Sequence, residues 1–220
     1  MPALIFDLDG TLVDTVYAHV LAWQRTLAES GMAIEGWRIH RRIGMSGGLF
    51  TRAVGRELGR DLTPQEVDIL QRRHGELFVQ LQPEPRPLPG ARELLGTLAR
   101  TGVPYGLATS GSRPDIDPSL AALGIGPEVV VVGRGDVARA KPAPDLFLAC
   151  QERLRARRED CWVVGDAVWD MQAARRAGML SVGLLSGGYG DEELSRAGAF
   201  RVYRDPQELL GALDELGLPI

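Results

Sequence analysis

The stretch Ala3-Leu4-Ile5-Phe6-Asp7-Leu8-Asp9-Gly10-Thr11 joins a short apolar run to two aspartates and a glycine. Apolar runs of this length, bounded by charged or turn-forming residues, are typical of strands buried on both faces of a parallel sheet. Every second side chain of a strand points to the same side, so we expect Asp7 and Asp9 to lie together just beyond the strand. Gly10 would let the backbone approach a ligand closely. The stretch therefore predicts a buried strand with a ligand site at its carboxyl end.

Similar apolar runs recur along the chain and alternate with helical patterns after residue 90. We predict further strands at 103–109, 129–132, 162–164, 180–185 and 200–203. Amphipathic patterns predict helices at 91–100, 112–123, 144–154, 168–177 and 206–216. Gly102, Gly124 and Gly178 each follow one of these helices, where a left-handed C-terminal cap is favoured. The alternation predicts an α/β fold with a doubly wound parallel sheet and right-handed crossovers.

Residues 15–82 interrupt this alternation, because they contain helical patterns and no convincing strand. We predict three helices here, at roughly 15–30, 47–59 and 64–81. A proline-rich stretch at 83–90 follows and has the composition of a stiff linker. The chain therefore divides into a Rossmann-like α/β core domain at 1–14 and 83–220 and a helical insert at 15–82, which the resemblance described below identifies as a cap domain.

The composition limits the partners that the protein can have. The 220 residues include 25 lysines and arginines against 29 aspartates and glutamates, which gives a net charge of −4. No basic run is longer than two residues and no apolar run approaches the length of a membrane span, so we expect no nucleic-acid or membrane partner. Cys150 and Cys161 lie in apolar stretches that are typical of reduced core thiols, and no secretory signal is evident. We expect a cytoplasmic protein, monomeric or dimeric.

Polar and charged residues follow four of the predicted strands, and the carboxyl ends of parallel strands form one crevice. Besides the two aspartates after the first strand, the later strands are followed by Thr109-Ser110-Gly111, Lys141-Pro142 and Gly165-Asp166, with Asp170 four residues further on. Two carboxylates 4 Å apart repel by about 4 kcal/mol at an effective dielectric constant near 20, so a cation is expected among them. Oxygen ligands without His or Cys favour Mg²⁺ over Zn²⁺.

These segments, in this order, resemble the four motifs of the haloacid dehalogenase superfamily of phosphohydrolases. The motif residues are Asp7-x-Asp9-Gly10-Thr11, Thr109-Ser110, Lys141-Pro142-x-Pro144-Asp145 and Gly165-Asp166-x-x-x-Asp170. The helical insert after the first strand is similar to the cap of the C1 group, which includes phosphoglycolate phosphatase and β-phosphoglucomutase. The resemblance covers nearly the whole chain.

The resemblance implies a role for each motif residue. Asp7 would be the nucleophile that forms an aspartyl phosphate, and Asp9 the general acid and base. Thr109 would bind the transferring phosphoryl group and Lys141 would steady it. Magnesium would be held by Asp7 and Asp166 and by the main-chain carbonyl of Asp9, while Asp170 would bind it through water or orient Lys141. Backbone or side-chain contacts to the substrate are expected from Leu8, Gly10, Ser110 and Gly111.

Predictions for the cap are less constrained by the motifs. Asp14-Thr15 has the pattern of a helix N-cap. His19 is either a half-buried cap residue or a substrate contact. Gly44-Met45-Ser46-Gly47-Gly48 is either a plain turn or a specificity loop over the leaving group, with Gly47 at the substrate. Arg52 is either a solvated charge or the ligand of a second anionic group. We expect His40, Arg41, Arg42 and His74 to lie on exposed helix surface.

The sequence therefore predicts a Mg²⁺-dependent phosphatase for a small phosphorylated metabolite of the phosphoglycolate or sugar phosphate class. A phosphomutase of the β-phosphoglucomutase type is the first alternative, since the same motifs would serve it. A receiver-like signalling module is a remote alternative, because such modules are about half as long and have no cap.

Overall fold

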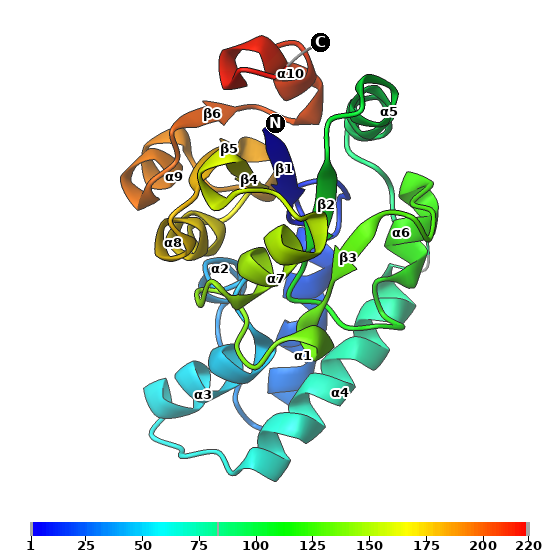
Figure 1. The fold of residues 1–220 in the computed structure, drawn as a ribbon. Coiled ribbons are helices and arrows are strands. Elements are labelled where there is room, and N and C mark those ends of the chain that lie inside the picture. The colour runs from blue at the N-terminus through cyan, green and yellow to red at the C-terminus, as the bar shows by residue number, and fades with distance from the viewer. Residues whose placement is uncertain (1, 83, 219–220) are drawn as a thin grey trace.

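The structure, a computed structural model, describes residues 2–82 and 84–218. Its centre is a parallel sheet of six strands in the order β3-β2-β1-β4-β5-β6 (Figure 1). The strands are β1 (Ala3–Phe6), β2 (Tyr105–Ala108), β3 (Val130–Val132), β4 (Cys161–Gly165), β5 (Leu180–Leu184) and β6 (Arg201–Tyr203). The predicted α/β fold is confirmed, with the first strand in the middle of the sheet.

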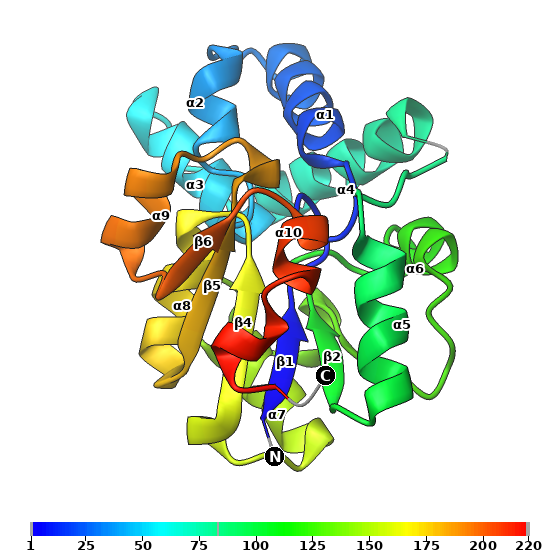
Figure 2. The ribbon, with the colours of Figure 1, turned by 90° about the horizontal axis from the view of Figure 1, so that it is seen from above.

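Helices cover both faces of this sheet (Figure 2). On one face, Leu94 and Leu209 join Phe6 in a single buried cluster. On the other face, Phe147 packs against Ile5 in a second cluster. The helices of the first face are α5 (Ala91–Thr101), α6 (Asp117–Leu123) and α10 (Pro206–Leu210), and those of the second are α7 (Asp145–Leu154) and α8 (Val168–Ala177), with α9 (Asp191–Ala197) beside α8. Because β1 is covered on both faces, its four residues are fully buried.

Four helices lie between β1 and α5 in the sequence and form the helical insert. They are α1 (Val16–Glu29), α2 (Gly36–His40), α3 (Gly47–Glu57) and α4 (Pro64–Leu81). The insert has a core of its own, in which Trp23, Phe50 and Leu70 pack together. In Figure 1 these helices lie beyond the carboxyl ends of the strands. The insert therefore covers the edge of the sheet where the sequence analysis predicts the ligand site.

Most predicted elements agree with the structure within a few residues, and the exceptions have local causes. The helix predicted at 112–123 begins only at Asp117, because the chain first turns through Pro114 and a proline disfavours helix in the residue before it. The helix predicted at 206–216 ends at Leu210, and a separate 3₁₀ turn follows. Helices α2 and α9 were not predicted. The 3₁₀ turns are η1 (Arg134–Asp136), η2 (Arg158–Asp160), η3 (Leu185–Gly187) and η4 (Leu213–Leu216). Pro83, the first residue of the predicted linker, lies outside the described residues, as do residues 1, 219 and 220 of the predicted core domain.

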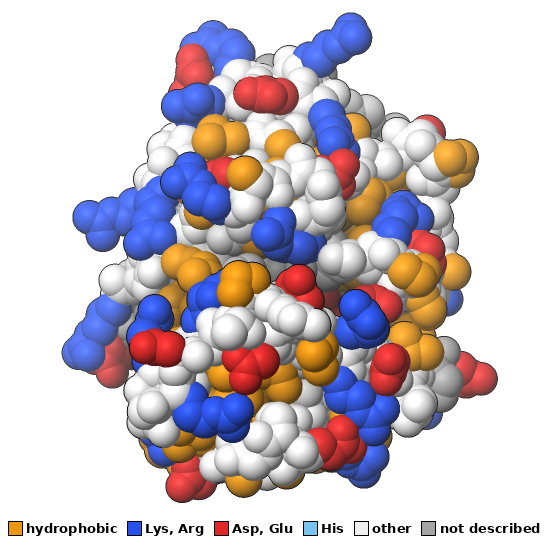
Figure 3. Space-filling view, turned by 90° about the horizontal axis from the view of Figure 1, so that it is seen from below, with side chains coloured by type: hydrophobic (Ala, Val, Ile, Leu, Met, Phe, Trp, Pro, Cys, Tyr) orange, Lys and Arg blue, Asp and Glu red, His pale blue; other side chains and the backbone are white. Residues whose placement is uncertain are grey.

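The surface carries both signs of charge. On the face shown in Figure 3, basic and acidic side chains are interspersed, so this face presents no extended field of one sign. Within residues 2–82 and 84–218, no helix combines the length and the apolar character that crossing a bilayer requires.

The packing of α5 against α10 can be tested with two glycines of left-handed conformation. Gly90 (φ +76°) precedes α5, and an added Cβ would lie 2.4 Å from the Cα atom of Gln207; at Gly102 (φ +71°), no atom lies within 4 Å. We expect Gly102→Ala to cost about 1 kcal/mol of unfolding free energy through backbone strain alone. Gly90→Ala should cost about 1–3 kcal/mol more, because the new methyl group meets backbone that cannot move aside. Urea unfolding of both variants measures the difference, and equal losses would contradict the close approach.

Candidate active site

The two aspartates after β1 lie at the carboxyl end of the sheet, as their spacing predicts. Asp7 is buried, and its main-chain N–H donates to the carbonyl of Val164 on β4 at 2.8 Å. Gly10 turns the chain with φ +81°, and an added Cβ would lie 2.5 Å from Asp166 Oδ2. The turn after β1 therefore requires glycine, since any side chain would displace the Asp166 carboxylate.

Lys141, the only lysine in the sequence, is buried between two carboxylates. Its Nζ lies 2.5 Å from Asp7 Oδ1 and 2.8 Å from Asp170 Oδ1, and the side chain has no exposed surface. Burial acts to lower the pKa of Lys141, but the charges of Asp170 and Asp7 outweigh it and hold this pKa above its ordinary value. The ammonium group therefore stays charged inside the protein.

Three buried carboxylates surround this lysine. One oxygen from each of Asp7, Asp166 and Asp170 falls in a cluster within 4.8 Å. Asp166 Oδ1 accepts a hydrogen bond from Thr11 Oγ1 at 2.7 Å, and Asp170 accepts one from the main-chain N–H of Ala167 at 3.0 Å. Burial raises the pKa of Asp7 to about 7 despite the opposing charge of Lys141, and burial together with Asp170 raises the pKa of Asp166 well above its ordinary value. One lysine leaves this cluster short of positive charge, and a hard divalent cation with oxygen ligands fits it.

The loop after β2 adds hydroxyl and backbone donors beside the carboxylates. The hydroxyl oxygen of Thr109, a buried residue, accepts a hydrogen bond from the main-chain N–H of Gly111 at 2.9 Å. Ser110 Oγ donates to the carbonyl of Gly44 in the insert at 3.2 Å. Ser110 therefore links the core to the loop between α2 and α3, in addition to lining the cavity described below.

Two residues of the insert contact the carboxylate of Asp9. Thr15 Oγ1 donates to Asp9 Oδ1 at 2.6 Å, and His19 Nε2 lies 3.4 Å from the same oxygen. Thr15 is the N-cap residue of α1, as predicted, but its hydroxyl donates to Asp9 and makes no capping hydrogen bond. Burial acts to raise the pKa of Asp9, but His19 and the Thr15 hydroxyl outweigh it and hold this pKa below its ordinary value.

His74 was expected on exposed helix surface and instead lies inside, against His19. The Nδ1 atom of His19 is 3.1 Å from Nε2 of His74, and the His74 ring stacks on Trp23 with centroids 4.1 Å apart. Burial lowers the pKa of His74 well below its ordinary value, and the nearby charge of His19 adds to this effect. A signal for this position existed, because Gln71, His74 and Phe78 recur at the spacing of one helix face.

Residues 40–42 were expected to be exposed and are only partly so, because this part of the insert docks on the core, although the Arg41 side chain remains 41% exposed. His40 Nε2 lies 2.8 Å from the carbonyl oxygen of Gly187. The carbonyl of Arg41 accepts hydrogen bonds from Trp169 Nε1 at 3.3 Å and from Tyr189 Oη at 2.8 Å. Arg42 lines the cavity described next.

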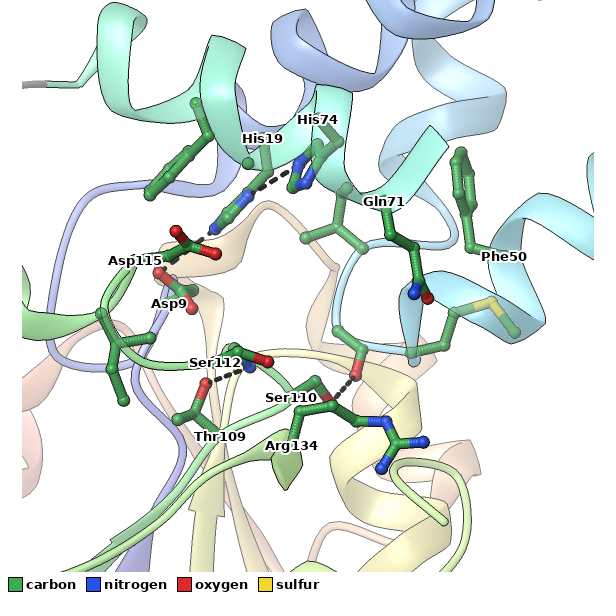
Figure 4. A pocket seen from close by; sticks show the side chains of 18 of the residues that line it. Asp9, His19, Phe50, Gln71, His74, Thr109, Ser110, Ser112, Asp115 and Arg134 are labelled. Atoms are coloured by element: carbon green, nitrogen blue, oxygen red, sulfur yellow. Dashed lines mark hydrogen bonds and ion pairs between the residues drawn. The ribbon is translucent and has the colours of Figure 1, made fainter. Parts of the chain in front are cut away.

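A cavity of about 170 Å³ lies between the insert and the core (Figure 4). Its core side is lined by Asp7, Asp9, Thr109, Ser110, Gly111, Ser112, Asp115, Ile116, Ser119 and Arg134. Its insert side is lined by His19, Trp23, Arg42, Ile43, Gly44, Met45, Gly47, Phe50, Gln71, His74, Gly75 and Phe78. The site therefore combines a polar end at the sheet with a largely aromatic and aliphatic end under the insert.

Some residues singled out in the sequence lie elsewhere. Leu8 is fully buried, with its side chain in the core cluster, and the N–H of Gly10 donates to the carbonyl of Val13 at 2.8 Å. Arg52 is not among the lining residues, and its Nη1 donates to the carbonyl of Leu62 at 3.3 Å.

Gly47, in contrast, lines the cavity as predicted, and an added Cβ would lie 3.2 Å from Gln71 Oε1. Sequence reasoning also missed Asp115 and Gln71, which carry no motif.

Comparisons with known proteins identify similar sequences and structures. A family model described as haloacid dehalogenase-like hydrolase matches residues 1–178. The chain is 31% identical over 224 residues to a phosphoglycolate phosphatase from Rhodospirillum rubrum, covering 99% of this chain and 91% of that protein. A crystal structure of a hydrolase from Pseudomonas syringae superposes with a TM-score of 0.95 at 46% identity, covering 98% of this chain and 99% of that one. A β-phosphoglucomutase structure from Clostridium difficile gives a TM-score of 0.85 at 25% identity, covering 98% and 96%.

The burial of Lys141 predicts its chemical reactivity. An amine-acylating reagent should leave the peptide that carries Lys141 unmodified in the folded protein, because the ammonium group is inaccessible and is paired with two carboxylates. The same peptide should be acylated after unfolding in urea, which serves as the control. Peptide mass spectrometry measures both, and rapid acylation of the folded protein would contradict the buried ion pair.

Proposed function

The chain belongs to the haloacid dehalogenase-like hydrolase family, and from this premise we propose that it is a Mg²⁺-dependent phosphatase for a small phosphorylated metabolite. The phosphoglycolate and sugar phosphate classes are the candidates for its substrate. The observation that carries the proposal is the pair of buried contacts from Lys141 to Asp7 and Asp170, beside the open polar end of the cavity. Such a lysine opposes the rise that burial causes in the pKa of Asp7 and holds the carboxylate in place to attack phosphorus.

In the proposed reaction, a carboxylate oxygen of Asp7 attacks the phosphorus atom and the bond from phosphorus to the leaving oxygen breaks. The protonated form of Asp9, which the low pKa makes the minor form, gives its proton to the leaving oxygen. The carboxylate then takes a proton from the water that hydrolyses the aspartyl phosphate, which restores the protonated form. Thr109, Ser110 and Gly111 would donate hydrogen bonds to the phosphoryl oxygens, and the ammonium group of Lys141 would also bind them. Most of the rate enhancement would come from orientation and from neutralising phosphoryl charge.

The carboxylates of Asp7, Asp166 and Asp170 would hold Mg²⁺, with the main-chain carbonyl of Asp9. The bound cation would neutralise charge between the attacking carboxylate and the phosphoryl group. We further propose that residues 15–82 act as a cap domain over the leaving group, and that residues 1–14 and 83–220 form the catalytic core domain. In support, twelve of the residues that line the cavity come from this segment.

Hydrolysis is favoured over the phosphomutase alternative by the cap loop. A mutase needs a cation for the phosphate group that is not reacting, because its intermediate carries two phosphates. Gly47 has no side chain, and the guanidinium of Arg52 donates to the carbonyl of Leu62 outside the cavity lining. We therefore propose transfer of the phosphoryl group to water.

The purified protein should release inorganic phosphate from at least one member of a panel of sugar phosphates, phosphoglycolate and nucleotides. Asp7→Asn should reduce this rate by several powers of ten, since it removes the nucleophile. Asp68→Asn, an exposed substitution of the same kind on α4, is the matched control and should keep full activity. Phosphate and isomerised sugar phosphate are measured on the same samples. Isomerisation faster than phosphate release would overturn the phosphatase proposal in favour of the mutase.

Magnesium should stabilise the folded protein as well as activate it, because a ligand that binds only the native state raises the unfolding free energy. The gain is about 2.7 kcal/mol when the free Mg²⁺ concentration is a hundred times its dissociation constant. Thermal melting with and without Mg²⁺ measures it. Asp166→Asn should abolish the shift, whereas Asp68→Asn should keep it. Full phosphatase activity after exhaustive chelation would contradict the metal assignment.

A further inference from the structure

The carboxyl group of Asp115 lines the cavity and has no hydrogen-bond or ion-pair partner within residues 2–82 and 84–218. It comes from the loop before α6 and faces α4 at Gly75, where an added Cβ would lie 3.2 Å from Asp115 Oδ2. Figure 4 shows it beside Asp9 and His19. Partial burial raises the pKa of Asp115, and the nearby charge of His19 opposes that rise. This carboxyl group is an acceptor that the proposed phosphoryl chemistry does not use.

A second unused polar group faces it. In Figure 4, Gln71 lies across the cavity from Asp115, and its amide points into the cavity from α4. The amide has no hydrogen-bond partner in the described part of the chain. An amide and a carboxylate together provide acceptors on both sides of the space that a leaving group would fill.

The histidines of this wall offer no free cation. Both ring nitrogens of His19 already have partners, since Nε2 lies 3.4 Å from Asp9 and Nδ1 lies 3.1 Å from His74. His74 stays neutral at physiological pH, because burial holds its pKa well below the ordinary value.

Two arginines also line the cavity, and of these Arg42 pairs with a carboxylate whereas Arg134 makes hydrogen bonds only to main-chain carbonyls among the described residues. Arg42 Nη1 donates to the carbonyl of Arg38 at 2.7 Å, and its Nη2 donates to Glu57 at 3.0 Å. Arg134 donates to the carbonyls of Val137 and Ala138 at 2.7 Å and 3.4 Å. Lys141 is fully buried in its pairs with Asp7 and Asp170. A second anion on the substrate would therefore meet the unpaired carboxylate of Asp115 in this wall. Arg134, which has no ion pair within the described residues, lies beside Ser110 and away from Asp115 in Figure 4.

We infer that the cavity selects phosphate esters whose leaving group carries hydroxyl or ammonium donors and no second anion, with Asp115 as the specificity-determining residue. The inference rests on the proposed phosphatase function and narrows its substrate class. A hydroxyl or ammonium group donates to Asp115 and to the carbonyl oxygen of Gln71. A carboxylate in the same place could accept from the amide N–H groups of Gln71, but it is repelled by Asp115 and leaves that acceptor unpaired, which is costly in a partly buried site.

Three small phosphate esters with leaving groups of different charge test this selection. They are phosphoglycolate, glycerol 1-phosphate and phosphoethanolamine, whose leaving groups are anionic, neutral and cationic. For the wild-type protein with Mg²⁺, we expect kcat/KM for phosphate release to be about tenfold or more higher for at least one of the latter two than for phosphoglycolate. Whichever of these two esters has the higher kcat/KM shows whether a hydroxyl or an ammonium donor is the better partner of Asp115.

Two variants test the residues themselves. Asp115→Asn should reduce the preference against phosphoglycolate, because it removes the repelling charge, and Gln71→Arg should reduce it further by adding a cation. Asp117→Asn is the matched control: it makes the same charge change two residues away, at a side chain that pairs with Arg113 and does not line the cavity, and it should leave the preference unchanged. Gln71→Arg keeps the test decisive if Asp115→Asn does not fold.

Different results would overturn the selectivity inference and the proposed phosphatase function. Equal or faster turnover of phosphoglycolate by the wild-type protein would overturn the inference alone, as would a preference that neither variant at Asp115 or Gln71 reduces. Absence of phosphate release from all three esters and from 4-nitrophenyl phosphate, which requires no specific leaving-group contact, would overturn the proposed phosphatase and this inference with it.

Discussion

A fully buried lysine between two carboxylates is the interaction on which the rest of this structure depends. Taking Lys141, Asp7 and Asp170 out of water costs several kcal/mol per charge, and only close pairing offsets that cost. The pairing requires three separate segments to end at one point: the end of β1, the loop after β3 and the first turn of α8. Parallel strands with right-handed crossovers bring their carboxyl ends to a single edge, so the sheet topology satisfies this requirement.

Local details around the ion pair follow from the same requirement. The Asp170 carboxylate lies at the start of α8, where it accepts the N–H of Ala167 and where the helix dipole favours a negative charge. Residue 165 must be glycine, because a Cβ there would lie 2.4 Å from the Cβ atom of Asp170. The buried charges thus constrain residues that have no chemical role of their own.

The insert is fastened to the same loops that carry the charges. The N–H of Ser46 donates to the carbonyl of Lys141 at 3.1 Å, and Ser110 donates to the carbonyl of Gly44. Hydrogen bonds to main-chain atoms therefore join the two sides of the cavity. The sides differ in chemistry, because the strand ends supply charge while α1 and α4 supply aromatic walls with a few polar groups. Contacts to the leaving group can change on the insert and in the loop after β2 without disturbing the ion pair. This separation explains how a phosphoglycolate phosphatase and a β-phosphoglucomutase can both resemble this chain over nearly its whole length.

The sequence by itself determined the parallel sheet, the helical insert and the gathering of Asp7, Asp9, Thr109, Lys141, Asp166 and Asp170 at one edge. These features depend on local periodicity, on glycine caps and on the rule that parallel strands end together, all of which can be read from neighbouring residues. Only the tertiary structure decided that the Thr15 hydroxyl binds Asp9 instead of capping α1, that His74 lies inside, and that Asp115 lines the cavity while Arg52 does not. Each of these depends on how the insert helices rotate and dock against the core. That docking is set by packing between segments far apart in the sequence, which local patterns do not encode.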